Sequence, residues 1–236
     1  MRLLGFALVS VVAALSTFAC SSTTTGSGTS GSSSGTSGAS GTSGSSGTSG
    51  SSGTSGSSGA LPPTSTTEAP VNVGGTCPTF AACGGSPQGT YDYAAGCVSD
   101  LLAAAKEQCP TLDSSGTKVT VRGSLHFIGA ALTRDAVATV SGTIVIPAAC
   151  SQGQCTAVEA ALKPSFDSVT CTGTTACTCT IKATDKTNNA TTFTVAGNTV
   201  TTADGESYSI CEKGSSFKYK GKSAGSEDGV WDLTKR

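Results

Sequence analysis

Eleven cysteines are the residues whose number and spacing indicate chemistry most directly. One of them, Cys20, stands alone near the N-terminus, whereas the other ten lie between residues 77 and 211. In a reducing cytosol such a set indicates metal ligands, but in an exported chain an even set indicates disulfide bonds. We therefore expect full pairing, in an order that the sequence leaves open, of Cys77, Cys83, Cys97, Cys109, Cys150, Cys155, Cys171, Cys177, Cys179 and Cys211. Cys150 and Cys155 bracket four residues and could close a local bridge.

A metal knuckle is the alternative for Cys171, Cys177 and Cys179. Zinc sites more often combine C-x-x-C pairs with a second pair or with histidines, and this chain has one histidine. The segment "DKTNNA" (185–190) is predicted to be a turn and not a calcium loop. No metal or other cofactor is expected.

The single histidine limits nucleophilic catalysis, because any Ser-His-Asp or Cys-His site must use it. His126 lies in "SLHFIG", a stretch of strand character, and is expected on a strand face with one hydrogen bond. The carboxylates considered for glycoside hydrolysis are Glu159, Asp167 and Glu206, none of which is marked by a flanking motif.

A group of lysines near the C-terminus suggests a modest basic edge: Lys213, Lys218, Lys220 and Lys222. Such an edge protects an exposed strand from aggregation; contact with an anionic envelope polymer is the alternative. The net charge of the whole chain is −1 and only 12% of its residues are charged, which gives no indication of a nucleic-acid partner.

The N-terminus has the pattern of a secretory signal peptide over residues 1–19, with Arg2 before an apolar run that ends in small residues. "TFAC" (17–20) resembles a lipobox in Ala19 and Cys20 and departs from it at Thr17 and Phe18. Acylation of Cys20 would explain the odd cysteine; simple secretion after Ala19 is the alternative. By resemblance to bacterial lipoproteins, Ser21 implies sorting to the outer membrane. The partner of Cys20 is then a lipid bilayer.

Residues 20–76 are predicted to be a tether. The tract from Ser21 to Gly59 consists almost entirely of Ser, Gly and Thr and has no apolar face to bury, so it is expected to stay disordered. Residues 60–76 follow as an extended Pro/Thr hinge.

Residues 77–236 are predicted to form one disulfide-stapled, mainly β domain. Strand-like runs occur at 118–129, 136–147, 191–202, 207–221 and 229–235, separated by short Gly- and Asn-containing loops. Two short helices are expected, at 99–109 with Ser99 as N-cap and at 156–163 before Pro164. The short loops favour an antiparallel meander, which buries one face either by closing as a lipocalin-like barrel or by forming a sandwich.

The stretches "CPTFAACGGSPQGTYDYAAGC", "CTGTTACTCTI" and "VAGNTVTTADGESYSIC" resemble cysteine-rich lipoproteins that recur in myxobacterial secretomes. Their turn rhythm is similar to that of small lipocalin-like barrels, with Tyr91 at a position where that pattern has Trp. The resemblance implies an envelope location and a cavity for a small apolar ligand, and no reaction.

These features together favour a lipid-anchored outer-membrane protein whose β head is a non-catalytic binding or surface-structural module. The ligand would be a small apolar molecule or an envelope polymer. An envelope hydrolase with paired carboxylates and a purely structural coat protein without ligand are the alternatives.

Overall fold

The computed structural model describes residues 62–222 and 229–236. The expected signal peptide, Cys20 and the Ser/Gly/Thr tract lie outside the described residues. Within the described part, the helices are all too short to cross a membrane.

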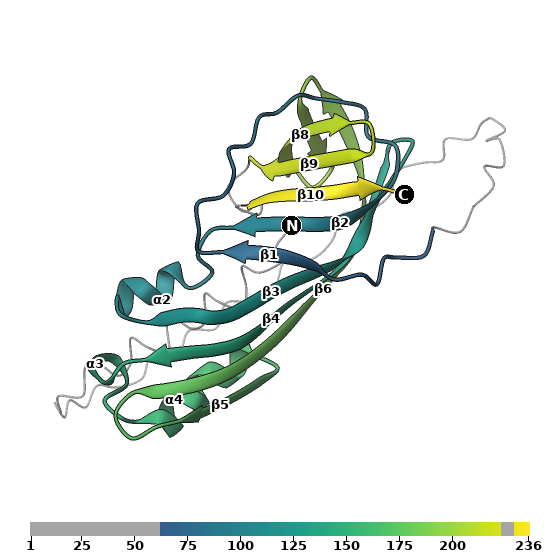
Figure 1. The fold of residues 1–236 in the computed structure, drawn as a ribbon. Helices are drawn as coiled ribbons and strands as arrows, with labels where there is room; N and C mark the ends of the chain where they lie inside the picture. The colour runs from purple at the N-terminus through teal and green to yellow at the C-terminus, as the bar shows by residue number, and fades with distance from the viewer. Residues whose placement is uncertain (1–61, 223–228) are drawn as a thin grey trace, which may run out of the picture. The chain divides into compact units, whose positions relative to one another are not determined.

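The described residues form ten strands and four short helical segments (Figure 1). The first part contains β1 (Ala69–Val73), β2 (Gly89–Val98), α2 (Ala103–Gln108), β3 (Asp113–Ile128) and β4 (Ala131–Ile146). The helices α3 (Ala148–Ser151), α4 (Cys155–Leu162) and η1 (Lys163–Ser165) follow. The second part contains β5 (Ser168–Thr172), β6 (Cys177–Ala196), β7 (Thr199–Thr202), β8 (Ser207–Lys213), β9 (Ser216–Gly221) and β10 (Gly229–Lys235).

All ten strands belong to one sheet, in the order β4-β3-β1-β2-β10-β9-β8-β7-β6-β5. Further pairings join β4 to β6 and β3 to β2, so the sheet closes on itself as a ring. Among the described strands, only β1 and β2 run parallel; the others pair antiparallel. The prediction of a mainly β fold whose antiparallel sheet closes and is stapled by disulfides is confirmed.

Three long strands extend beyond the ring: β3 and β4 with 16 residues each and β6 with 20 (Figure 1). Gly123 and Gly142 allow β3 and β4 to lie this close together. Both have positive φ, and a Cβ at either position would lie 2.2 Å from a carbonyl oxygen of the other strand. Only glycine takes this backbone conformation without strain.

The helices gather at the end of the long strands farthest from the β7–β9 hairpins (Figure 1). Two disulfides hold them there: Cys109 after α2 bonds to Cys150 in α3, and Cys155 in α4 bonds to Cys177 in β6. These short helices have few backbone hydrogen bonds of their own, so the covalent links fix their positions.

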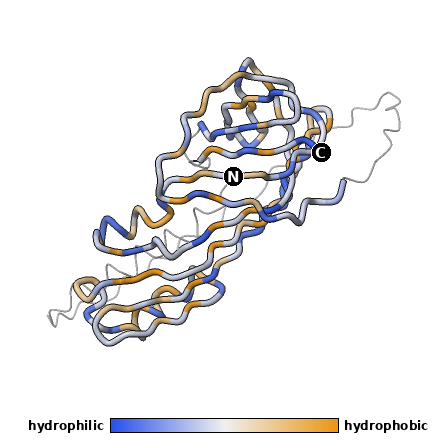
Figure 2. The backbone as a smooth tube through the Cα atoms, in the orientation of Figure 1, coloured by the Kyte–Doolittle hydropathy of each residue, from blue (hydrophilic) through white to orange (hydrophobic). Residues whose placement is uncertain are grey.

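The core follows from the two-residue alternation of the strands, which appears as alternating colours along the tube in Figure 2. In β9, Phe217 and Tyr219 are buried, whereas Lys218 and Lys220 are exposed. This predicted alternation is confirmed.

Several local predictions are wrong because long-range pairing overrides local propensity. Residues 185–190 are not a turn but the middle of β6, where they pair with residues 133–138 of β4. Residues 69–73 of the expected hinge form β1, which lies between β2 and β3. The folded domain thus begins before residue 77.

Two further corrections concern an N-cap and a sheet edge. Ser99 is not the N-cap of α2; Asp100 instead accepts a hydrogen bond from the Leu102 amide and starts the turn, and the helix begins at Ala103. The lysines of β9 do not protect an edge, because β9 pairs on both sides, with β8 and with β10.

Candidate functional site

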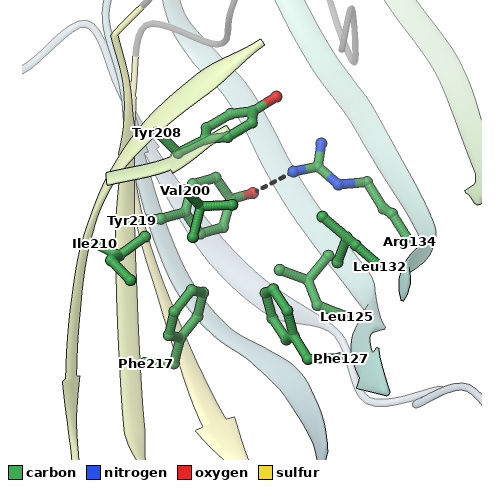
Figure 3. A pocket seen from close by; sticks show the side chains of 9 residues that line it. All are labelled: Leu125, Phe127, Leu132, Arg134, Val200, Tyr208, Ile210, Phe217 and Tyr219. Atoms are coloured by element: carbon green, nitrogen blue, oxygen red, sulfur yellow. Dashed lines mark hydrogen bonds between the residues drawn. The ribbon is translucent and has the colours of Figure 1, made fainter. Parts of the chain in front are cut away.

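A pocket inside the ring is the first candidate site, and we call it the ring pocket (Figure 3). Side chains of β3, β4, β7, β8 and β9 line it: Leu125, Phe127, Leu132, Arg134, Val200, Tyr208, Ile210, Phe217 and Tyr219. They come from inward positions of strands on both sides of the ring. One charged group, the Arg134 guanidinium, thus faces a wall of apolar and aromatic side chains.

Arg134 is 1% exposed and is the only charged member of this lining. Its Nη2 donates a hydrogen bond to the Tyr219 hydroxyl at 2.9 Å (Figure 3), and its Cζ lies 5.6 Å from the centre of the Tyr219 ring. The Tyr219 hydroxyl also lies 3.0 Å from that of Tyr93 on β2. A buried charge is retained at low cost only when such partners satisfy it.

Aromatic rings pack against one another in the ring interior. Phe127 and Phe217 meet edge to face at 5.3 Å between centroids, and Tyr208 and Tyr219 do so at 5.6 Å. Edge-to-face packing is favourable because the positive ring edge meets the negative ring face. The space left free in the ring pocket is about 20 Å³, which suffices for one water molecule.

The three carboxylates considered for hydrolysis have different surroundings. Glu159 on α4 accepts a hydrogen bond from the Cys171 amide and pairs with Lys163, and these two contacts hold its pKa below the usual range. Glu206, in the turn before β8, accepts a hydrogen bond from the Tyr208 hydroxyl. Asp167 is exposed before β5. Glu159 and Glu206 thus have local structural partners, and none of the three lines the ring pocket.

His126 lies on a strand, β3, as expected; its side chain is on the face opposite to Leu125 and Phe127 and is 2% exposed. Its Nδ1 lies 3.1 Å from the Thr90 hydroxyl of β2. Burial lowers the pKa of His126, and the nearby Arg236 lowers it further, against the opposing effect of Asp135 and Asp92. The imidazole is therefore neutral near pH 7 and has a structural hydrogen bond.

A polar cluster beside His126 fixes the segment before β1. Arg236 forms a two-pronged ion pair with Asp92 and also donates a hydrogen bond to the Pro63 carbonyl. The Ser65 amide donates to the Ser124 hydroxyl at 3.0 Å. The last residue of the chain thus binds the segment that enters the domain, which no local motif in the sequence indicated.

All ten clustered cysteines are paired in five disulfides: Cys77–Cys97, Cys83–Cys211, Cys109–Cys150, Cys155–Cys177 and Cys171–Cys179. The suggested local bridge between Cys150 and Cys155 is wrong, because each of them bonds to a residue of a different element. Residues 171, 177 and 179 are not a metal knuckle, since their sulfurs are all oxidised. In the described residues, no group of three or more potential ligands could hold a metal ion.

Two of the lysines in the basic group have polar partners. Lys218 pairs with Asp232 of β10 at 3.0 Å, and Lys222 donates to the Thr199 hydroxyl at 3.2 Å. Lys213 and Lys220 are exposed. The group therefore lies on the outer surface of the ring.

Sequence reasoning missed Arg134, although a signal for it exists. In "ALTRDAVATV" the arginine occurs at the same alternate positions as Leu132, Ala136 and Ala138, which are apolar. A charged residue on the apolar face of a strand indicates a buried, paired group.

Comparison of the chain with protein-family models, with curated proteins and with solved structures gives no match.

Proposed function

We propose that the chain is a lipoprotein of a bacterial outer membrane, held by an acylated Cys20, whose β domain is a non-catalytic surface-structural module. The observation that carries the structural role is the filled ring. Interlocking aromatic side chains and the Arg134–Tyr219 contact leave about 20 Å³ free. An interior of this kind supports rigidity more than the uptake of a large ligand.

The disulfides support export from the cytosol. Five disulfides in a domain of this size form and persist in oxidising compartments and are rare in the cytosol. An envelope location agrees with the signal peptide and the lipobox-like "TFAC" of the sequence.

Replacement of the anchor cysteine tests this function. In Cys20→Ser, which cannot form the thioether, we expect the protein to move from the membrane fraction to the soluble fraction on cell fractionation. Ser21→Ala is the matched control, since it preserves Cys20 and is expected to stay with the membrane. A Cys20→Ser protein that stays in the membrane fraction would contradict the lipoprotein assignment.

Binding of a small apolar acid in the ring pocket is the second candidate, favoured by Arg134. A guanidinium in an apolar pocket suits a carboxylate, and the side chains around it must move apart to admit one. Octanoate would then raise the melting temperature of the wild-type domain and not that of Arg134→Met. No effect of octanoate on either protein would favour the structural role alone.

A further inference from the structure

A second pocket lies on the long sheet beyond the ring, and we call it the sheet pocket. Its floor is formed by adjacent strands, with Val140 of β4 paired with Ala183 of β6, and Ile181 close by. Its walls come from the turn before α2 and from the end of η1. The residues lining it are Val73, Asp100, Leu101, Leu102, Ser114, Thr117, Val140, Ser165, Phe166, Ile181 and Ala183.

Disulfides brace both walls of the sheet pocket. The first wall precedes α2, and Cys109 at the end of α2 is bonded to Cys150 in α3. The second wall, at η1, directly follows α4, and Cys155 in α4 is bonded to Cys177 in β6. A pocket whose walls are covalently held is preformed, so a ligand does not have to order it on binding.

Of the polar residues that line the sheet pocket, which are Asp100, Ser114, Thr117 and Ser165, Ser165 is the one with a buried hydroxyl that lacks a partner. It is 7% exposed, and its Oγ has no hydrogen-bond partner in the described part of the chain. A buried hydroxyl without a partner destabilises a fold, so the absence of a partner for Ser165 Oγ requires a reason. A ligand hydroxyl would provide this partner once the Ser165 side chain turns toward the pocket, since Ser165 Oγ is buried as it stands.

The charges around the sheet pocket disfavour an anion. None of its lining residues is cationic, whereas Asp100 is acidic and Asp185 lies on the same face of β6, two residues beyond Ala183. The Asp100 carboxylate is already occupied, because it pairs with Lys106 at 2.5 Å and accepts a hydrogen bond from the Leu102 amide. A neutral ligand therefore fits this surface better than a charged one.

We propose that the sheet pocket binds a small neutral molecule with an apolar body and one hydroxyl group, which exchanges a hydrogen bond with Ser165 Oγ. The free space at its centre is about 40 Å³, twice that of the ring pocket, and half-buried Leu101 and Phe166 lie at its border. The hydroxyl enters this space, and the apolar body packs on Val140 and Ile181. The site is independent of the lipid anchor.

Benzyl alcohol is the probe, added to the whole oxidised chain from residue 20 with Cys20→Ser to remove the lipid. We expect saturable shifts in the methyl NMR signals of Val140 and Ile181 and none at Val200 in the ring pocket. Toluene, which lacks the hydroxyl, is expected to bind about 3- to 10-fold more weakly, and benzoate to give no shift at these methyls.

Variants of two pocket residues separate binding from folding. Ser165→Ala should weaken benzyl alcohol binding about 3- to 10-fold and raise the melting temperature, because it removes an unpartnered hydroxyl. Ala183→Leu should abolish binding by filling the pocket, with the ring methyl signals unchanged as proof of folding. Ser168→Ala, at an exposed position of β5, is the matched control and should bind as the parent does.

Three results of the binding experiments would overturn the proposal: no saturable shift at Val140 and Ile181, equal affinity of the parent and Ser165→Ala, or a preference for benzoate. A crystal structure in benzyl alcohol that shows only an ordered water on Ser165 Oγ would also overturn it.

Discussion

Arg134 on β4 donates a hydrogen bond to the Tyr219 hydroxyl on β9, with 2.9 Å between Nη2 and the hydroxyl oxygen. The two strands do not pair with each other, and in the hydrogen-bonded ring β3, β2 and β10 lie between them on one side. On the other side they are separated by β6, β7 and β8. This contact therefore braces opposite walls of the ring through its interior.

Removal of this brace should destabilise the domain. Arg134→Met is expected to lower the free energy of unfolding by about 2–4 kcal/mol, because it breaks a buried charged network, and Tyr219→Phe by about 1–2 kcal/mol. The double variant should lose less than the sum, with a coupling of about 1 kcal/mol in urea unfolding. Lys220→Met, on the exposed face of β9, is the control and should change stability by less than about 0.5 kcal/mol. If the loss in the double variant equalled the sum of the two single losses, the Arg134–Tyr219 contact would not stabilise the domain as a pair.

The disulfides should contribute unequally, according to the length of chain that each one closes. Cys83–Cys211 has a sequence separation of 128 and Cys171–Cys179 of 8. From loop-closure entropy, double Cys→Ala substitution of the first pair should lower the free energy of unfolding by about 5 kcal/mol. The same substitution of the second pair should lower it by about 2.5 kcal/mol. Denaturant unfolding of the two double variants measures both. Equal losses of free energy of unfolding in the two double variants would show that the entropy of the unfolded chain does not determine how much each disulfide stabilises the domain.

The depressed pKa of His126 makes stability depend on pH. Burial and Arg236 lower it below the usual 6.5, so between that value and the folded pKa the unfolded chain binds more protons than the folded one. The free energy of unfolding should therefore be highest above about pH 6.5, fall as the pH decreases towards the folded pKa, and level off below it. Urea unfolding measured at pH values from 7.5 to 5 tests this prediction. In His126→Gln, the part of the pH dependence of the free energy of unfolding that comes from His126 should be lost. If His126→Gln kept the pH dependence of the wild-type protein, that dependence would have to come from other titrating groups.

The cluster around Arg236 should control the segment that enters the domain. Arg236→Ala removes the ion pair with Asp92 and the bond to the Pro63 carbonyl. The Ser65 amide should then exchange its hydrogen faster, whereas the amides of β1 should keep their protection, because β1 pairs with β2 and β3. The same variant should raise the pKa of His126, since it removes a nearby positive charge.

Lys235→Ala is the matched control for this exchange experiment, because the Lys235 ammonium group pairs with Glu212 and not with Asp92. Unchanged exchange at Ser65 in Arg236→Ala would show that the segment is held by other contacts.

The fold class followed from local patterns, whereas closure and several elements depended on distant partners. The alternation around Phe217 and Tyr219 and the short loops between β6 and β9 were sufficient to predict antiparallel hairpins. Asp185 and its neighbours have turn propensity, but sixteen consecutive pairings between β4 and β6 hold them in a strand. β1 was missed for the same reason, since five residues of "APVNV" become a strand only between β2 and β3.

The candidate sites divide in the same way. An even set of cysteines predicted disulfides, but the order of pairing needed the fold, because Cys150 and Cys155 face different elements. The position of Ser165 in a pocket depends on how η1 packs on the long sheet, which no local pattern reports. Arg134 could have been identified from the sequence, because the alternation of residues in β4 puts this charged residue on the apolar face of the strand.

The most direct test of the account is an intact mass spectrum of the protein purified from its native membrane. We expect a chain that begins at Cys20, carries a diacylglyceryl group and an N-terminal acyl chain, and lacks ten hydrogen atoms relative to the fully reduced form. A chain that begins at Cys20 without lipid, or one whose cysteines at 77–211 can be alkylated without prior reduction, would contradict it.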